Sequence, residues 1–171
     1  MLSEIDETTP ILGANAVHRL SRRTILAGLF AATAVLSAPR YAAAAASVRV
    51  TNLRAFREAL GMLAPSYRHA LIDVRADWCA ACLRMEREVF PHPAIRRLLE
   101  DVATIKVDVT AMDSANRELL AYLRVDGPPT FFVVNTASGG EYARTRSVGG
   151  LKRRELIRRL QPFAARGTTN D

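Results

Sequence analysis

Two cysteines, Cys79 and Cys82, are the only ones among the 171 residues, and their setting constrains the fold more than any other feature. An apolar run over residues 70–74 predicts a buried strand before them, and residues 81–90 predict a helix that begins at the pair. Cys79 is therefore expected at the positive end of a helix, where free amides favour a thiolate. Cys82 follows one turn later and faces inward. Because only a thiolate attacks a disulfide, this arrangement predicts a redox-active pair.

Other uses of a Cys-x-x-Cys pair fit the sequence less well. Haem attachment requires a histidine directly after the pair, where this chain has Leu83. Zinc requires further ligands at close spacing, and the three histidines are scattered along the chain. We therefore expect neither a metal site nor a cofactor. One alternative stays open, in which a non-enzymatic binding module or assembly factor holds a soft ion such as Cu(I) between the cysteines, with Met85 as a weak additional ligand.

The remaining pattern predicts an α/β domain in which strands and helices alternate. Predicted helices cover residues 52–64, 81–90, 94–100, 114–123 and 151–165, and predicted strands cover 70–74, 103–109, 130–135 and 142–148. Thr51 or Asn52 is expected to cap the first helix, and Ser114 the fourth. These elements predict a central mixed sheet of about four strands flanked by helices.

Residues 1–46 predict an N-terminal export signal. Arg22 and Arg23 precede an apolar run over residues 25–37, which is shorter than the roughly 20 residues of a transmembrane helix. Residues 42–46 are all alanine and supply small residues for cleavage. Residues 21–26 resemble the twin-arginine export motif, with general secretion as the alternative. The sequence leaves open whether an uncut signal tethers the domain to the membrane.

The net charge of the chain gives little information about its binding partners. The chain carries 24 Lys and Arg against 17 Asp and Glu, a formal charge of +7. No basic stretch contains interleaved aromatic residues that would stack on bases, so we expect no nucleic-acid partner. The arginine-rich surface is most simply a solvated one.

The segment around the cysteines resembles the active-site segment of the thioredoxin superfamily. The similarity covers residues 50–163, and residues 78–90 and 107–113 are closest to the thioredoxin-like C-terminal domain of DsbD-type thiol–disulfide reductases and related exported thioredoxins. The resemblance implies a thioredoxin fold for residues 47–165, after the export region and before a flexible tail at 166–171. Residues 127–130, Gly-Pro-Pro-Thr, are similar to the cis-proline loop of the superfamily, which implies a cis Pro129 against the cysteine pair.

Further roles follow from the same resemblance. Asp73 stands within the apolar strand, so burial should raise its pKa; by resemblance it would accept the proton of Cys82, and Lys106 on the next strand is expected near it. Trp78 would shield the pair and contact the partner protein. Pro129 would also contact the partner protein. Ala80 and Ala81 replace the Gly-Pro of common thioredoxins, and because they add no charge they favour a reductant.

Together these features predict an exported, periplasmic thiol–disulfide oxidoreductase that reduces protein disulfides through a mixed disulfide with Cys79. We expect its electrons to come from a separate membrane reductase.

Overall fold

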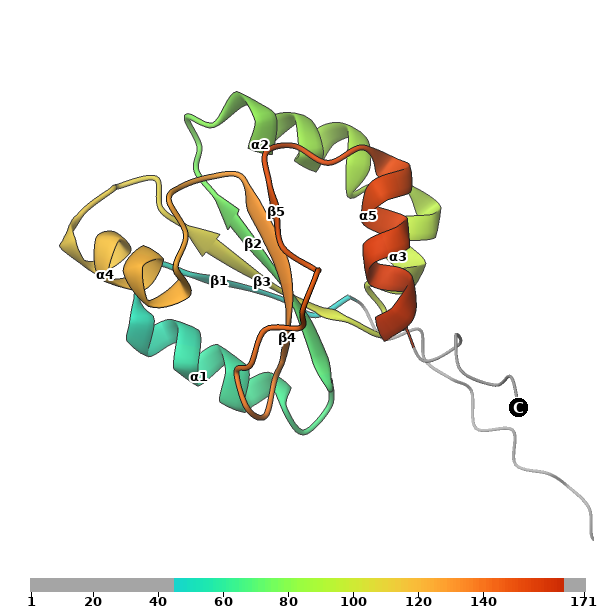
Figure 1. Cartoon of the computed structure of the whole chain (residues 1–171), viewed down its shortest axis with the longest axis horizontal. Helices are drawn as coiled ribbons and strands as arrows, with labels where there is room; N and C mark the ends of the chain where they lie inside the picture. Colours follow the sequence, from blue (N-terminus) through green and yellow to red (C-terminus); the bar gives the residue numbers. More distant parts are fainter. Residues whose placement is uncertain (1–44, 165–171) are drawn as a thin grey trace, which may run out of the picture. The chain divides into compact units, whose positions relative to one another are not determined.

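Five strands form one mixed sheet in the computed structural model of the chain, which describes residues 45–164 (Figure 1). The strands are β1 (Ser47–Val50), β2 (His69–Arg75), β3 (Ala103–Asp108), β4 (Thr130–Asn135) and β5 (Ser147–Val148). Their order across the sheet is β1-β3-β2-β4-β5, with β1, β3 and β2 parallel. Strand β4 runs antiparallel to β2 and to β5. Strand β2, which leads to the cysteines, is therefore in the middle of the sheet and paired on both sides.

Helices cover both faces of this sheet. They are α1 (Leu53–Leu63), α2 (Ala80–Arg84), the π-helix η1 (Met85–Val89), α3 (Pro93–Leu98), α4 (Ser114–Leu123), α5 (Arg153–Leu160) and the 3₁₀ turn η2 (Gln161–Phe163). Helices α1 and α4 lie on one face, and α3 and α5 lie on the other (Figure 1). Cys82 of α2 packs in the cluster of α1 and α4, and Met85 of η1 packs in the cluster of α3 and α5. Within residues 45–164, no helix has the length and apolar character required to cross a membrane.

The two faces of β2 contribute to two separate hydrophobic clusters, because successive side chains of a strand point to opposite sides. Ile72 and Val74 belong to the cluster that contains Phe56 of α1. Leu71 belongs to the cluster on the other face, which includes Ile95 and Leu156 of α3 and α5. Asp73 and Arg75 follow Leu71 at alternate positions, so both side chains point toward the face that carries α3 and α5.

The thioredoxin fold predicted from the sequence is confirmed, with two corrections to its strands. Strand β1 was not predicted, and the sheet has five strands instead of about four. This strand is four residues long, lies at the sheet edge and has mostly polar or half-exposed positions, so it gives little apolar signal. The strand predicted for residues 142–148 is also too long. Arg144 has a positive φ of 65°, and the Thr145 hydroxyl accepts from the Val133 amide in place of a strand partner.

Helix boundaries needed three further corrections. The helix predicted for residues 81–90 changes from α to π geometry at Met85, and the one predicted for 151–165 begins at Arg153 and ends as a 3₁₀ turn containing Pro162. Asp113, not Ser114, caps α4 by accepting from the Asn116 amide at 2.8 Å. The export region, except for residues 45 and 46, and the predicted tail lie outside the described residues.

Candidate active site at the cysteine pair

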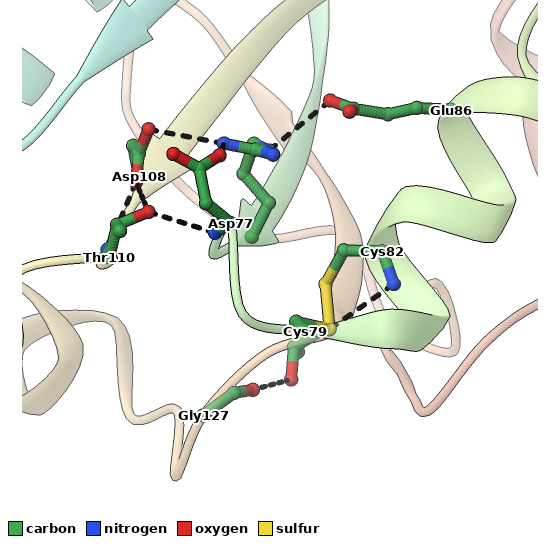
Figure 2. The surroundings of a disulfide bond; sticks show 9 residues. Asp77, Cys79, Cys82, Glu86, Asp108, Thr110 and Gly127 are labelled. Carbon is green, nitrogen blue, oxygen red and sulfur yellow. Dashed lines mark hydrogen bonds and ion pairs between the residues drawn. A yellow bond between two sulfur atoms is a disulfide. The ribbon is translucent and has the colours of Figure 1, made fainter.

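Cys79 and Cys82 form a disulfide at the start of helix α2 (Figure 2), with their Cα atoms 5.3 Å apart. Cys79 is the N-cap residue of α2, and Cys82 lies within the first turn. Cys79 is 7% exposed and Cys82 is 2% exposed. Both predicted positions, one at the helix end and one turned inward, are therefore present. Both residues are buried, and Cys79 is the more exposed of the two.

The backbone of α2 directs a donor at the first of these sulfurs. The amide of Cys82 donates to Sγ of Cys79 at 3.2 Å, as a cap does at a helix N-terminus. When the disulfide is reduced, the same amide and the helix dipole favour negative charge on Cys79. Cys82 lies within the first turn of the helix and does not occupy the N-cap position. The geometry therefore distinguishes an outer cysteine suited to be a thiolate from an inner one suited to remain a thiol.

Asp73 lies in the central strand β2, which leads to the cysteine pair, and is 2% exposed. Within residues 45–164, no group donates a hydrogen bond to its Oδ2. Burial raises the pKa of Asp73 to about 7, and the charge of Lys106 on β3 only partly opposes this effect. Lys106 is the register partner of Asp73, as expected, but its ammonium forms an ion pair with Glu86 at 3.0 Å. Asp73 is thus a buried carboxyl group that exchanges a proton near neutral pH.

Arg75 is a site feature that the sequence analysis missed. Its side chain is 3% exposed, and its guanidinium lies between three carboxylates: Asp77 at 2.8 Å, Asp108 at 3.2 Å and Glu86 at 3.2 Å (Figure 2). Asp108 also accepts from Arg49 of β1. One feature of the sequence could have revealed this role: Arg75 is a charged residue two positions after Asp73, on the same face of a buried strand. Arg75 connects the central strand to both the loop before Cys79 and the helix after Cys82.

Asp108 and Thr110 fix the loop that leads to the cysteines. Thr110 donates to Asp108 through both its amide and its hydroxyl, and the same hydroxyl accepts from the Asp77 amide at 2.9 Å. Burial of Asp108 disfavours its charge, but the Thr110 hydrogen bonds and the charges of Arg75 and Arg49 outweigh burial and lower its pKa. Trp78 is 57% exposed and donates from Nε1 to the carbonyl oxygen of Thr110 at 3.0 Å. The indole is therefore held in place beside Cys79 while most of it faces solvent.

The loop before β4 completes the site. The Pro128–Pro129 peptide bond is cis, as the resemblance implied. Gly127 of the same loop lies among the residues that surround the disulfide in Figure 2. The carbonyl oxygen of Pro129 accepts from the Gly149 amide at 2.9 Å, which joins this loop to the end of β5. Segments from four parts of the chain thus meet around two sulfurs: the end of β2, α2, the Pro129 loop and the loop after β5.

No metal-binding group accompanies the pair. In the part of the chain that the structure describes, no three His, Cys, Asp or Glu side chains gather in a way that could hold a metal ion.

This fold, with a Cys-x-x-Cys disulfide at a helix start and a cis-proline loop, defines a protein of the thioredoxin-fold class. A family model described as thioredoxin-like matches residues 51–136, half of the chain, and the chain belongs to that family. The structure is similar to the C-terminal domain of Neisseria meningitidis DsbD in the reduced form, with a TM-score of 0.56 and 23% identity, covering 67% of this chain and 99% of that one. It is also similar to a thioredoxin from Thermus thermophilus, with a TM-score of 0.54 and 26% identity over 70% of this chain and 89% of that one.

The chain also matches parts of longer proteins. The chain is 40% identical over 80 residues to thiol:disulfide interchange protein DsbD 2 of Pseudomonas aeruginosa. These residues make up 47% of this chain and 13% of that protein. It is 36% identical over 92 residues to DsbD of Pasteurella multocida. Here the aligned residues make up 54% of this chain and 16% of that protein. The chain therefore spans less than a fifth of the length of these two relatives.

Proposed function

We propose that this protein is an exported thiol–disulfide oxidoreductase that reduces disulfides in protein substrates. The observation that carries the proposal is the Cys79–Cys82 disulfide at the start of α2, which follows the central strand that contains the buried Asp73. The similarity of the chain to proteins named as thiol:disulfide interchange proteins supports the proposal.

The reaction starts from the dithiol. The Cys79 thiolate, favoured by the Cys82 amide, attacks one sulfur of a substrate disulfide, so the substrate's other sulfur leaves as a thiolate. A mixed disulfide then joins Cys79 to the substrate. Asp73 accepts the proton of Cys82, and the resulting Cys82 thiolate attacks Sγ of Cys79. The substrate's second thiol leaves, and two electrons have passed from the cysteine pair to the substrate.

Trp78 and Pro129 have supporting roles in this proposal. The exposed indole beside Cys79 offers a flat apolar surface to the substrate segment around the attacked disulfide. Pro129 offers a backbone edge without an amide hydrogen of its own. Both residues are therefore proposed to contact the substrate and take no part in proton transfer.

Electron flow is proposed to run from this protein to its substrates. Ala80 and Ala81 lie between the cysteines and add no charge that would stabilise the Cys79 thiolate and make the disulfide strongly oxidising. We expect a reduction potential nearer to the roughly −270 mV of thioredoxin than to the roughly −120 mV of DsbA, the two ends of the known range. A separate membrane reductase would restore the dithiol in the periplasm, where residues 1–46 would direct the domain.

Reduction of insulin by the pre-reduced protein tests the activity directly. Cys82→Ser should accumulate a mixed disulfide with insulin through Cys79, visible as a covalent adduct by mass spectrometry, because the resolving thiol is gone. Cys79→Ser is the matched variant and should form little adduct, since the remaining thiol is buried. If Cys82→Ser forms no adduct, or wild type reduces no insulin, the proposal fails.

A further inference from the structure

A cavity of about 440 Å³ is lined in part by the helix that carries the cysteine pair. One wall comes from α2 and η1, and the other comes from residues 150–153, where the loop after β5 leads into α5. Ala81, between the two cysteines, is one of its lining residues. A Cβ on Gly150 of the opposite wall would be only 3.8 Å from that of Ala81, so the two walls are close together at the cysteines.

The cavity combines an apolar lining with a basic rim. Ala81, Met85, Val89 and Leu151 supply apolar surface, and Met85 and Leu151 are buried. Arg84, Lys152 and Arg153 also line it, and all three are exposed. Glu88 is the one acidic residue that lines it. Among residues 45–164, no carboxylate forms an ion pair with any of the three basic side chains.

The mechanism above does not use this basic rim, although the cavity reaches Ala81, which lies between the two cysteines in the sequence. The loop that leads through Lys152 to Arg153, the first residue of α5, is joined to the Pro129 loop by the Gly149 hydrogen bond, so it belongs to the frame of the active site. A polypeptide whose disulfide reaches Cys79 would place its neighbouring residues within reach of this cavity. Unpaired cations at the edge of an apolar cavity attract carboxylates on such a segment.

We propose that this cavity binds an acidic segment next to the disulfide of the partner protein, with carboxylates on the Arg84–Lys152–Arg153 rim and a small apolar side chain against Met85 and Leu151. The inference rests on the proposed function, since it concerns the partner that exchanges disulfides with Cys79. It predicts that Cys79 reacts preferentially with partners that carry an acidic segment, a preference that the cysteine pair alone does not produce.

Two synthetic disulfide peptides provide the test. They are identical except that three residues beside one cysteine are Glu in the first and Gln in the second. The pre-reduced full chain should react with the acidic peptide about tenfold faster than with the neutral one at low salt, the size expected for a few partly exposed ion pairs. The preference should shrink in 1 M salt, where the Debye length falls to about 3 Å.

Charge-reversal variants test whether the basic residues of the cavity cause the preference for the acidic peptide. Lys152→Glu together with Arg153→Glu should abolish or invert the ratio of the two rates, and an acidic residue in the first turn of α5 is compatible with the helix. Arg96→Glu together with Arg97→Glu is the matched control, because it changes the net charge equally on α3, away from the cavity. The control should keep most of the preference. Arg84→Gln, on the opposite wall, should reduce the ratio independently.

The outcomes separate the two proposals. Equal rates for the two peptides with wild type overturn the cavity proposal, and so does an equal loss of preference in the α3 control. Failure of wild type to react with either peptide overturns the proposed function instead.

Discussion

Arg75 and Glu86 form an ion pair, with Nε and Oε1 3.2 Å apart, that links the central strand β2 to the π-helix following the cysteines. The contact is an ion pair and not an aligned hydrogen bond. Glu86 also pairs with Lys106 of β3, so one carboxylate joins two cations from neighbouring strands. The helix that presents Cys82 is therefore anchored electrostatically to the same strand that carries Asp73.

Replacing Arg75 with Met should destabilise the protein by about 3 kcal/mol, because Asp108 and Glu86 lose a buried partner and part of their compensating charge. Urea unfolding of the oxidised protein measures this. Arg54→Met is the control, since it removes an exposed pair with Glu58 on α1 and should cost less than about 0.5 kcal/mol. Arg75→Lys should recover part of the loss. An Arg75→Met variant as stable as wild type would show that the cluster contributes nothing.

Replacing Asp73 with Asn should slow resolution of the mixed disulfide by about 100-fold, because the amide accepts no proton from Cys82. Single-turnover reactions quenched with acid, followed by mass spectrometry, measure the lifetime of the mixed disulfide. The wild-type rate should rise with pH around a midpoint near 7, and the variant should lack this rise. Asp77→Asn removes a nearby but exposed carboxylate and should keep the midpoint. An unchanged pH profile in Asp73→Asn would exclude Asp73 as the proton acceptor.

Asp73 should also make the oxidised protein less stable as pH rises from about 4 to about 7. Burial raises its folded pKa to about 7 from the ordinary value of 3.8. Between these values the unfolded chain releases the proton while the folded protein retains it, so increasing pH favours unfolding by up to about 1.4 kcal/mol per pH unit. Below this window both states are protonated, and above it both are ionised. Urea unfolding of wild type and Asp73→Asn across pH 4.5–8 should therefore give curves that diverge, and parallel curves would refute the assignment.

Replacing Arg22 and Arg23 with Lys should prevent export if the twin-arginine route is used, because that route reads the arginine pair and not its charge. The mature domain should then remain in the cytoplasmic fraction of a bacterial host, as judged by immunoblotting of fractionated cells. Arg19→Lys with Arg40→Lys makes the same conservative change outside the pair and should leave export intact. Normal export of the Arg22/Arg23 variant would favour general secretion.

The sequence predicted the parts of the site that depend on local order along the chain. The buried strand, the helix after it and the spacing of the cysteines are all local, so Cys79 at the helix start and Asp73 within the strand followed from periodicity. Arg75 was missed because its importance depends on Asp108 and Glu86, which reach it only through strand pairing and helix packing. Strand β1 was missed for the same reason, since its register is set by β3 and not by an apolar pattern of its own.

Local chemistry along the chain thus specified a cysteine pair at a helix N-terminus and a buried carboxyl group in the strand before it. Packing alone established the charge surrounding these groups and the cavity that α2 helps to line. Both features require side chains from segments far apart in the sequence: Arg75 with Asp108, and Arg84 with Lys152. Alternation and capping act over a few residues, whereas electrostatic and cavity-forming contacts depend on which elements the folded sheet brings together.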